Sequence, residues 1–303
     1  MVTKLSPPTY DTTDTINQVV ADRVWYRDFF DLIKENWLLH INRYVENSGN
    51  PEVIAPLDIS PYITQERIIA EENKNPEGNA LQALIKKRTA SLKGLYEPVE
   101  GTELHSYLKN MRDNHGLLFC PACGEPGKPT TLDHYLPQSK YPELSIVFEN
   151  LTPMCDKCQR LKDNNILNTE GQKLFIHPYY DQIETIRIML EILPPYNHPE
   201  RFLARVPDDI GSPLRDICER HIKEIDFVNR FENYCISEYS DLLEIISEER
   251  DEPEGDSVRK IVRRFLRKAE IKSPNHWEAI FYRGVLENND LITFLETEEL
   301  FND

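Results

Sequence analysis

Apolar residues recur at a helical spacing of about 3.6 over most of the chain. In the first third this spacing predicts helices over residues 14–46, 64–73, 79–95 and 102–115. The first segment is either one long helix or two helices with a kink, with Thr13 and Asp14 as suitable caps and a Ser-Gly-Asn-Pro stop at 48–51. In the last third the spacing predicts helices over residues 213–246, 257–270 and 274–296.

The middle of the chain has a different pattern. Glycine, proline and cysteine concentrate between residues 116 and 178, residues 129–132 favour a short strand, and residues 155–164 favour a helix with Leu161 packed inward. We therefore predict a mainly α fold in which a small hairpin-and-helix module is embedded between two helical regions. The predicted parts are residues 1–115, 116–180 and 181–303.

Composition places the chain among globular proteins. It has 303 residues, of which 40% are apolar, and no stretch approaches the roughly 20 apolar residues that span a bilayer. The first residues lack the apolar core of a signal peptide. We therefore expect no membrane association and a cytoplasmic location, where paired cysteines more often bind metal than each other. Cys218 and Cys235 have no partner spacing and are expected in the core.

Two tight cysteine pairs bracket the middle segment. Cys120 and Cys123 are followed by a glycine, and 31 residues separate Cys123 from the second pair, Cys155 and Cys158. Two Cys-x-x-Cys pairs supply the four thiolates of a structural Zn²⁺ site. The gap between the pairs is longer than in a usual zinc ribbon, which leaves room for an inserted functional hairpin. Such a small module buries little core, so zinc would supply folding energy directly.

Between the cysteine pairs lies an Asp133-His134 dipeptide, at the end of the predicted strand and three residues before Pro137. Phosphodiester hydrolysis needs a base that deprotonates water and a divalent cation at the scissile phosphate. Histidine suits the base at neutral pH, and a carboxylate is a hard oxygen ligand for Mg²⁺ or Mn²⁺. The dipeptide therefore predicts a metal-dependent nuclease centre.

Residues from about 118 to 165 resemble an HNH endonuclease with the ββα-metal fold. The resemblance implies that His134 is the general base, that Asp133 binds the catalytic Mg²⁺ or Mn²⁺, and that Asn150 pins the loop that orients His134. The third motif position, after the last cysteine, is usually His or Asn and binds the metal. Here it is Gln159, whose longer side chain shifts the amide oxygen.

Residues close to Gln159 offer other polar groups for the third motif position. Asp163 or Asn164, about one turn further along the predicted helix, could replace it as the metal ligand. Lys162 matches a basic residue often found in the motif and is expected to contact a phosphate. If the site has decayed at Gln159, the chain is instead a zinc-stabilised adaptor or binding module.

Residues 134–145 and 175–181 narrow the resemblance to the HNH proteins that accompany an ATPase in bacterial anti-phage defence, the Septu pair among them. This implies a nuclease subunit that cuts foreign DNA and docks on an ATPase partner through its helical flanks, the N-terminal region above all. Cleavage of RNA, such as tRNA, uses the same hydrolytic parts and stays open. His177, in the second string, is either close to the active centre or a core or turn-capping residue.

The charge balance limits how the chain could hold a nucleic acid. The formal net charge is −17, whereas phosphate binding normally relies on a basic surface. Two stretches are locally basic. In residues 80–95, Lys86, Lys87 and Arg88 form either a cationic face for nucleic acid or a solvated surface; in residues 258–268, acids just upstream favour the solvated surface.

Overall fold

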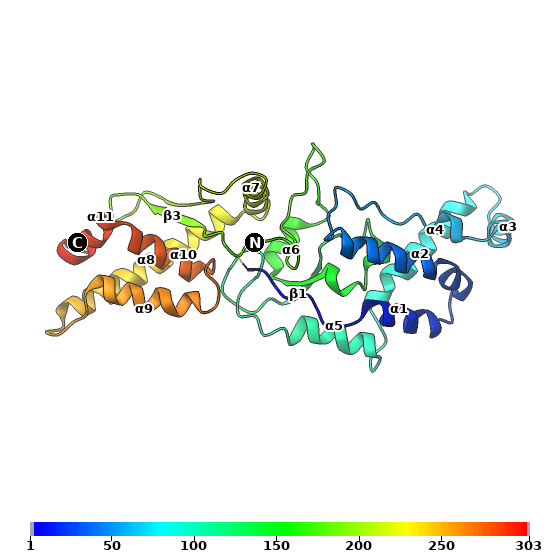
Figure 1. Ribbon diagram of the computed structural model, residues 1–303, viewed down its shortest axis with the longest axis horizontal. Coiled ribbons are helices and arrows are strands. Elements are labelled where there is room, and N and C mark those ends of the chain that lie inside the picture. Colours follow the sequence, from blue (N-terminus) through cyan, green and yellow to red (C-terminus); the bar gives the residue numbers. More distant parts are fainter. Residues whose placement is uncertain (1–2, 302–303) are drawn as a thin grey trace.

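The computed structural model describes residues 3–301. Figure 1 shows an elongated molecule with a helical region at each end and a small sheet between them. Strands in the described residues form only two antiparallel two-stranded sheets. The predicted mainly α fold with a small central module is confirmed. None of the helices in residues 3–301 is long and apolar enough to cross a membrane.

The N-terminal region contains helices α1 to α5 and short 3₁₀ turns. The 14–46 segment is two helices, because Tyr26 between them adopts a left-handed conformation with φ of 60°. Asp11, rather than Thr13 or Asp14, caps the first of these helices through a 2.9 Å hydrogen bond from the Asp14 amide. The bounds are α1 Thr12–Ala21, α2 Arg27–Glu46, α3 Gln65–Lys74, α4 Ala80–Lys93 and α5 Glu103–Asp113.

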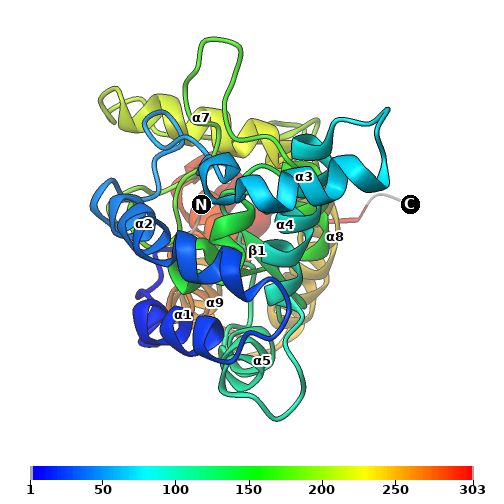
Figure 2. The ribbon, with the colours of Figure 1, turned by 90° about the vertical axis from the view of Figure 1, so that its right-hand side faces the viewer.

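The central module consists of β1 (Thr131–His134), β2 (Leu151–Met154) and α6 (Asp156–Lys162). β1 pairs antiparallel with β2, so that the first and last residues of β1 oppose Met154 and Leu151. Figure 2 shows α1, α2 and α5 around this sheet, and α5 packs on both strands. The prediction for Leu161 was wrong: it is 41% exposed, and the buried side of α6 carries Cys158 and Lys162, four residues apart.

The C-terminal region adds a second sheet to the predicted helices. Strands β3 (Met189–Ile192) and β4 (Phe202–Arg205) pair antiparallel, and α8 and α10 pack against them. The 213–246 segment is two helices with a left-handed Asp226 between them. The 274–296 segment is also two helices, divided at Asn288, whose backbone is extended. The helices are α7 Leu214–Glu224, α8 Phe227–Asp251, α9 Val258–Glu270, α10 Trp277–Glu287 and α11 Asn289–Thr297.

Two residues of the C-terminal region, His221 and Trp277, contact the backbone around the first cysteine pair. His221 of α7 lies with Nε2 2.9 Å from the carbonyl of Ala122. Trp277 of α10 donates from its indole to the Cys123 carbonyl at 2.6 Å and from its backbone amide to Gly124 at 3.2 Å. Cys218 and Cys235 are buried on α7 and α8, as predicted. The C-terminal helices therefore support the central module directly.

Candidate metal centre and active site

The four paired cysteines meet at one point. Their sulfur atoms all lie within 4.8 Å of one another, and those of Cys123 and Cys155 are 3.9 Å apart. A tetrahedral Zn²⁺ with Zn–S bonds of about 2.3 Å requires sulfurs about 3.8 Å apart. The backbone amide of Cys155 points at Cys120 Sγ, and that of Cys158 points at Cys155 Sγ, each at 3.4 Å. The cluster therefore fits a structural zinc site.

Arg230, on α8, lies against this cluster. Its guanidinium is 3.3 Å from Cys158 Sγ and 3.5 Å from Cys123 Sγ, and it forms an ion pair with Glu125. Burial alone lowers the pKa of Arg230, but the neighbouring cysteine sulfurs and Glu125 outweigh it and raise the pKa. Four thiolates around one Zn²⁺ carry a net charge of −2, and Arg230 offsets part of it. Because it is remote in sequence, Arg230 gives no local signal.

His134 stands at the end of β1 with its ring held by two contacts. Nε2 lies 2.9 Å from the Ser145 carbonyl, and the Tyr96 ring packs against it edge-on at 4.5 Å. A carbonyl only accepts, so Nε2 carries the proton and Nδ1 keeps its lone pair. Burial lowers the pKa of His134 to about 4, which keeps the ring neutral at pH 7. The geometry provides a neutral imidazole with Nδ1 as the basic atom.

Asp133, the preceding residue, is also buried and faces α6. Its Oδ2 lies 3.0 Å from the ammonium of Lys162, which also donates a 2.7 Å hydrogen bond to the His134 carbonyl. Burial raises the pKa of Asp133, while Lys162 and a polar contact with Gln159 act in the opposite direction. The carboxylate is therefore surrounded by positive charge and an amide.

These residues suit a divalent cation in the type of donor they offer. Oδ2 of Asp133 is buried without a hydrogen bond of good geometry, and the side-chain amide of Gln159 contacts the carboxylate through its N–H, so its oxygen would have to turn towards a metal to bind it. Hard oxygen atoms in small number are what Mg²⁺ accepts from a protein. Lys162 already places one positive charge there, so a metal ion would compete with its ammonium. Within residues 3–301, the cysteines are the only cluster of three or more potential metal-ligating Cys, His, Asp or Glu side chains.

Asn150 lies beside His134 with its amide fully buried. Its Oδ1 accepts a 2.8 Å hydrogen bond from the Leu136 amide, and its Nδ2 donates to the carbonyls of Leu136 at 3.0 Å and Leu144 at 3.3 Å. These bonds close the loop that runs from the end of β1 to Ser145. Since Ser145 supplies the carbonyl for His134, Asn150 fixes the surroundings of the histidine ring.

Comparison with known proteins supports this reading of the centre. Residues 120–165 match the HNH endonuclease family. The match contains both cysteine pairs, Asp133, His134 and Asn150. The chain is also 22% identical to Protein ea31 of Escherichia phage lambda over 193 residues, which cover 56% of this chain and 62% of that protein. No solved structure matches the chain.

The other candidates near the HNH motif have different positions. Lys162 is only 2% exposed and is held by Asp133, so in this arrangement its ammonium does not face a phosphate. Asp163 and Asn164 are exposed, and Asn164 accepts a hydrogen bond from Ser139. Gln159 is therefore the third-position residue that the structure brings to Asp133.

The predicted cationic face on α4 is only partly present. Arg88 is buried with its guanidinium 3.8 Å above the Tyr26 ring, so its expected role at the surface is wrong. Lys87 is exposed but pairs with Glu71 at 2.6 Å, and Lys86 is exposed. On α9, Lys260 and Arg264 pair with Asp256, which lies just before the helix. Neither stretch is a uniform basic surface.

Two residues that sequence reasoning missed complete the site. Tyr96 packs on His134 and donates a 2.9 Å hydrogen bond to the Leu132 carbonyl, while Arg112 of α5 donates to its hydroxyl at 3.2 Å. Tyr44 of α2 donates to Asn150 Oδ1 at 3.2 Å. Both tyrosines come from the N-terminal helical region, and neither belongs to a recognisable motif.

Proposed function

We propose that this chain is a metal-dependent HNH endonuclease that hydrolyses phosphodiester bonds in DNA. The observation that carries the proposal is the hydrogen bond between His134 Nε2 and the Ser145 carbonyl. It leaves Nδ1 unprotonated on a neutral ring, the state that a general base requires. The HNH match over residues 120–165 supports the same chemistry.

In this proposal His134 removes a proton from the attacking water through Nδ1. Asp133 and Gln159 would hold Mg²⁺ or Mn²⁺, which when bound stabilises the negative charge that develops on the phosphate and the leaving oxygen. Asn150 keeps the loop in place, and Tyr96 limits rotation of the His134 ring. The zinc-binding cysteines and Arg230 hold the start of α6, and so Gln159, in register with β1.

A second candidate function is a zinc-stabilised binding module without catalysis. The observation in its favour is the buried Lys162–Asp133 ion pair, which already neutralises the proposed metal ligand. Gln159 at the third motif position points the same way. In this case His134 and Asn150 would only be parts of the core. An intact zinc site with no metal-dependent cleavage is the expected behaviour.

We further propose an ATPase-associated role in defence against foreign DNA, with the partner on the N-terminal region. Large apolar side chains are exposed there: Val24 and Trp25, between α1 and α2, are 83% and 79% exposed, and Leu39 on α2 is 60% exposed. Large apolar side chains that gather on an exposed surface often mark protein interfaces. A net charge of −17 also suits a nuclease whose DNA is brought by another subunit.

The proposal is tested with supercoiled DNA, linear duplex, single-stranded DNA and tRNA, each with Mg²⁺, Mn²⁺ or EDTA. The expected result is cation-dependent cleavage of a DNA substrate, stimulated if a co-purifying ATPase is added. Cleavage confined to tRNA would move the substrate class to RNA. Zinc-loaded, folded protein that cuts none of the four under any condition would favour the binding module.

A further inference from the structure

The inward face of α2 contacts the loop that holds His134. Trp37, His40 and Tyr44 are buried at helical spacing along one side of this helix. Trp37 donates from its indole to the Glu143 carbonyl at 2.7 Å, and His40 Nε2 lies 3.1 Å from Glu143 Oε1. Glu143 lies two residues before Ser145, whose carbonyl contacts His134. The helix is therefore bonded to the loop at several points.

Tyr44 provides the contact closest to the centre of the motif. Its hydroxyl donates to Asn150 Oδ1 at 3.2 Å and lies 2.9 Å from His177 Nε2. Asn150 Oδ1 also accepts from the Leu136 amide. Tyr44 therefore joins His177, from the second sequence string, to the asparagine of the HNH motif.

The direction of this hydrogen-bond chain follows from His177. Its Nδ1 accepts a 3.2 Å hydrogen bond from the Tyr179 amide, so in the neutral ring Nε2 carries the proton. Nε2 then donates to the Tyr44 oxygen, and the Tyr44 proton is shared between Asn150 Oδ1 at 3.2 Å and the Glu149 carbonyl at 3.3 Å. Burial lowers the pKa of His177 well below its usual range, in keeping with a neutral ring.

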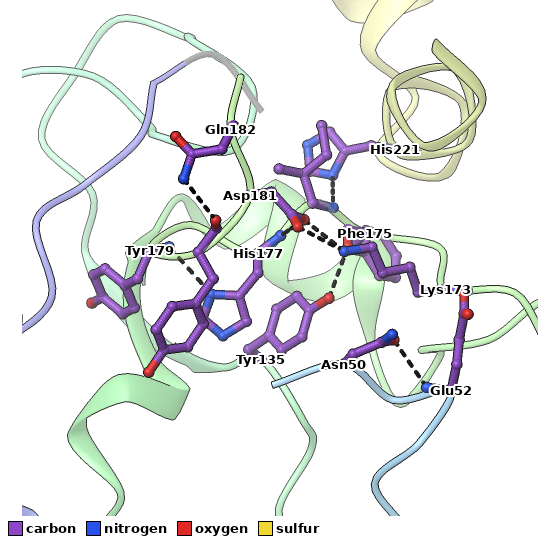
Figure 3. Close-up of polar contacts among 12 residues, drawn as sticks. Asn50, Glu52, Tyr135, Lys173, Phe175, His177, Tyr179, Asp181, Gln182 and His221 are labelled. Atoms are coloured by element: carbon purple, nitrogen blue, oxygen red, sulfur yellow. Dashed lines mark hydrogen bonds and ion pairs between the residues drawn. The ribbon is translucent and has the colours of Figure 1, made fainter. Parts of the chain in front are cut away.

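The surroundings of His177 restrict its rotation. Figure 3 shows it among Tyr135, Tyr179 and Asp181, where Asp181 accepts from the His177 amide at 2.7 Å and pairs with Lys173. The Tyr135 ring packs on it at 4.2 Å, and the Tyr135 hydroxyl bonds to the Phe175 carbonyl. The segment from Phe175 to Asp181 thus holds the imidazole at a fixed angle to Tyr44.

We propose that His177 and Tyr44 are positioning residues, which act through Asn150 and the loop it closes to hold His134 with Nδ1 available as the base. This inference rests on the proposed nuclease function. It assigns a role to the second sequence string and makes α2 part of the catalytic support. His177 therefore has two roles. It accepts the hydrogen bond from the Tyr179 amide, and it begins the chain of hydrogen bonds through Tyr44 to Asn150, which we call the relay.

Two substitutions of His177 separate these roles. In His177→Gln the amide nitrogen takes the place of Nε2, so the donor to Tyr44 is kept and the acceptor for Tyr179 is lost. In His177→Asn the amide oxygen takes the place of Nδ1, so the turn cap is kept and the donor to Tyr44 is lost. The relay predicts that His177→Gln retains most of the cleavage rate, while His177→Asn loses about 10-fold or more. The reverse order, or equal loss, would overturn it.

Tyr44→Phe removes only the hydroxyl and should match His177→Asn. The loss should be in the maximal rate, with the DNA concentration for half-maximal rate unchanged, and the double variant should be no worse than either single one. Tyr239→Phe is the matched control, since it removes a buried hydroxyl that bonds to the Tyr196 carbonyl in the C-terminal region. Zinc content and thermal unfolding confirm that each variant is folded.

A second readout tests the relay without cleavage. Two-bond ¹H–¹⁵N spectra of the histidine rings, with His134 assigned by its loss in His134→Ala, report which ring nitrogen carries the proton. The wild type should show His134 protonated at Nε2, and Tyr44→Phe should change that signal. Unchanged His134 signals in Tyr44→Phe would overturn the inference. If the wild type cleaves nothing, the proposed function fails, and the ring signals alone decide the positioning role.

Discussion

The guanidinium of Arg230 lies 3.3 Å from Cys158 Sγ, although the two residues are 72 positions apart in the chain. The contact joins α8 to the first turn of α6, and Arg230 also reaches Cys123 and Glu125. The four-cysteine cluster that fits zinc is thus completed by a helix outside the HNH match. Its charge balance depends on the C-terminal region being folded.

We predict that Arg230→Met weakens zinc binding about 10-fold or more, because the net negative charge of the thiolate cluster is then less well offset. The measurement is competition for zinc with a chromogenic chelator. Arg201→Met is the control, since Arg201 pairs with Glu232 at the surface, 49% exposed. Equal zinc affinity in both variants and the wild type would show that Arg230 does not stabilise the bound ion.

Removal of the Lys162 side chain should leave the Asp133 carboxylate without its positively charged partner. Lys162→Met leaves a buried carboxylate without its partner and should lower the free energy of unfolding by about 3 kcal/mol in urea at pH 7.5. Lys157→Met, which breaks the exposed pair with Glu125, should lower it by less than about 1 kcal/mol.

Magnesium should then restore part of the loss. Because the ammonium no longer competes for Asp133, Mg²⁺ should raise the unfolding temperature of Lys162→Met more than that of the wild type. Thermal unfolding with Mg²⁺ and with EDTA measures this difference. No effect of Mg²⁺ on either protein would speak against a metal site at Asp133 and for the binding module.

Acid should destabilise the fold through its buried neutral histidines. Burial lowers the pKa of His221 well below the value of about 6.5 expected in the unfolded chain. Below pH 6.5 the unfolded state therefore binds a proton that the folded state does not, and the free energy of unfolding falls as the pH decreases. His221→Gln keeps a donor for the Ala122 carbonyl and should reduce this dependence by about 1.4 kcal/mol per pH unit. Urea unfolding at pH 7.5, 6.0 and 5.0 measures how the free energy of unfolding changes with pH in the wild type and in His221→Gln. The same pH dependence in both proteins would show that His221 does not cause the loss of stability in acid.

The parts of the site that the sequence predicted are local in the chain. Two Cys-x-x-Cys pairs and an adjacent Asp133-His134 predict their chemistry because each group lies within a few residues. Tyr44, Tyr96 and Arg230 could not be predicted, since nothing local marks a side chain that reaches the site from a distant helix. The ion pair of Lys162 depends on which side of α6 faces Asp133, and a helix of seven residues with a single cysteine gave too little periodicity to decide it.

In the fold, too, the sequence predicted the features that have a local signal and missed others. Helical spacing located the helices, but the left-handed residues Tyr26 and Asp226 that interrupt them have no glycine signal. Strands β3 and β4 were missed although their apolar residues alternate: Leu190 and Ile192 are buried along β3, with Ile188 buried just before it, and Phe202 and Ala204 are buried along β4. This period of two was a usable signal. The three-part division of the chain stays a prediction.

The central claim is that His134 is the base of a metal-dependent nuclease. The most direct test is the initial rate of plasmid nicking with Mn²⁺ or Mg²⁺ for the wild type, His134→Ala and His105→Ala, the last being a histidine on α5 outside the site. We predict that His134→Ala lowers the initial rate at least about 100-fold with zinc content unchanged, and that His105→Ala keeps the wild-type rate. Nicking that persists in folded His134→Ala would contradict the assignment of His134 as the base.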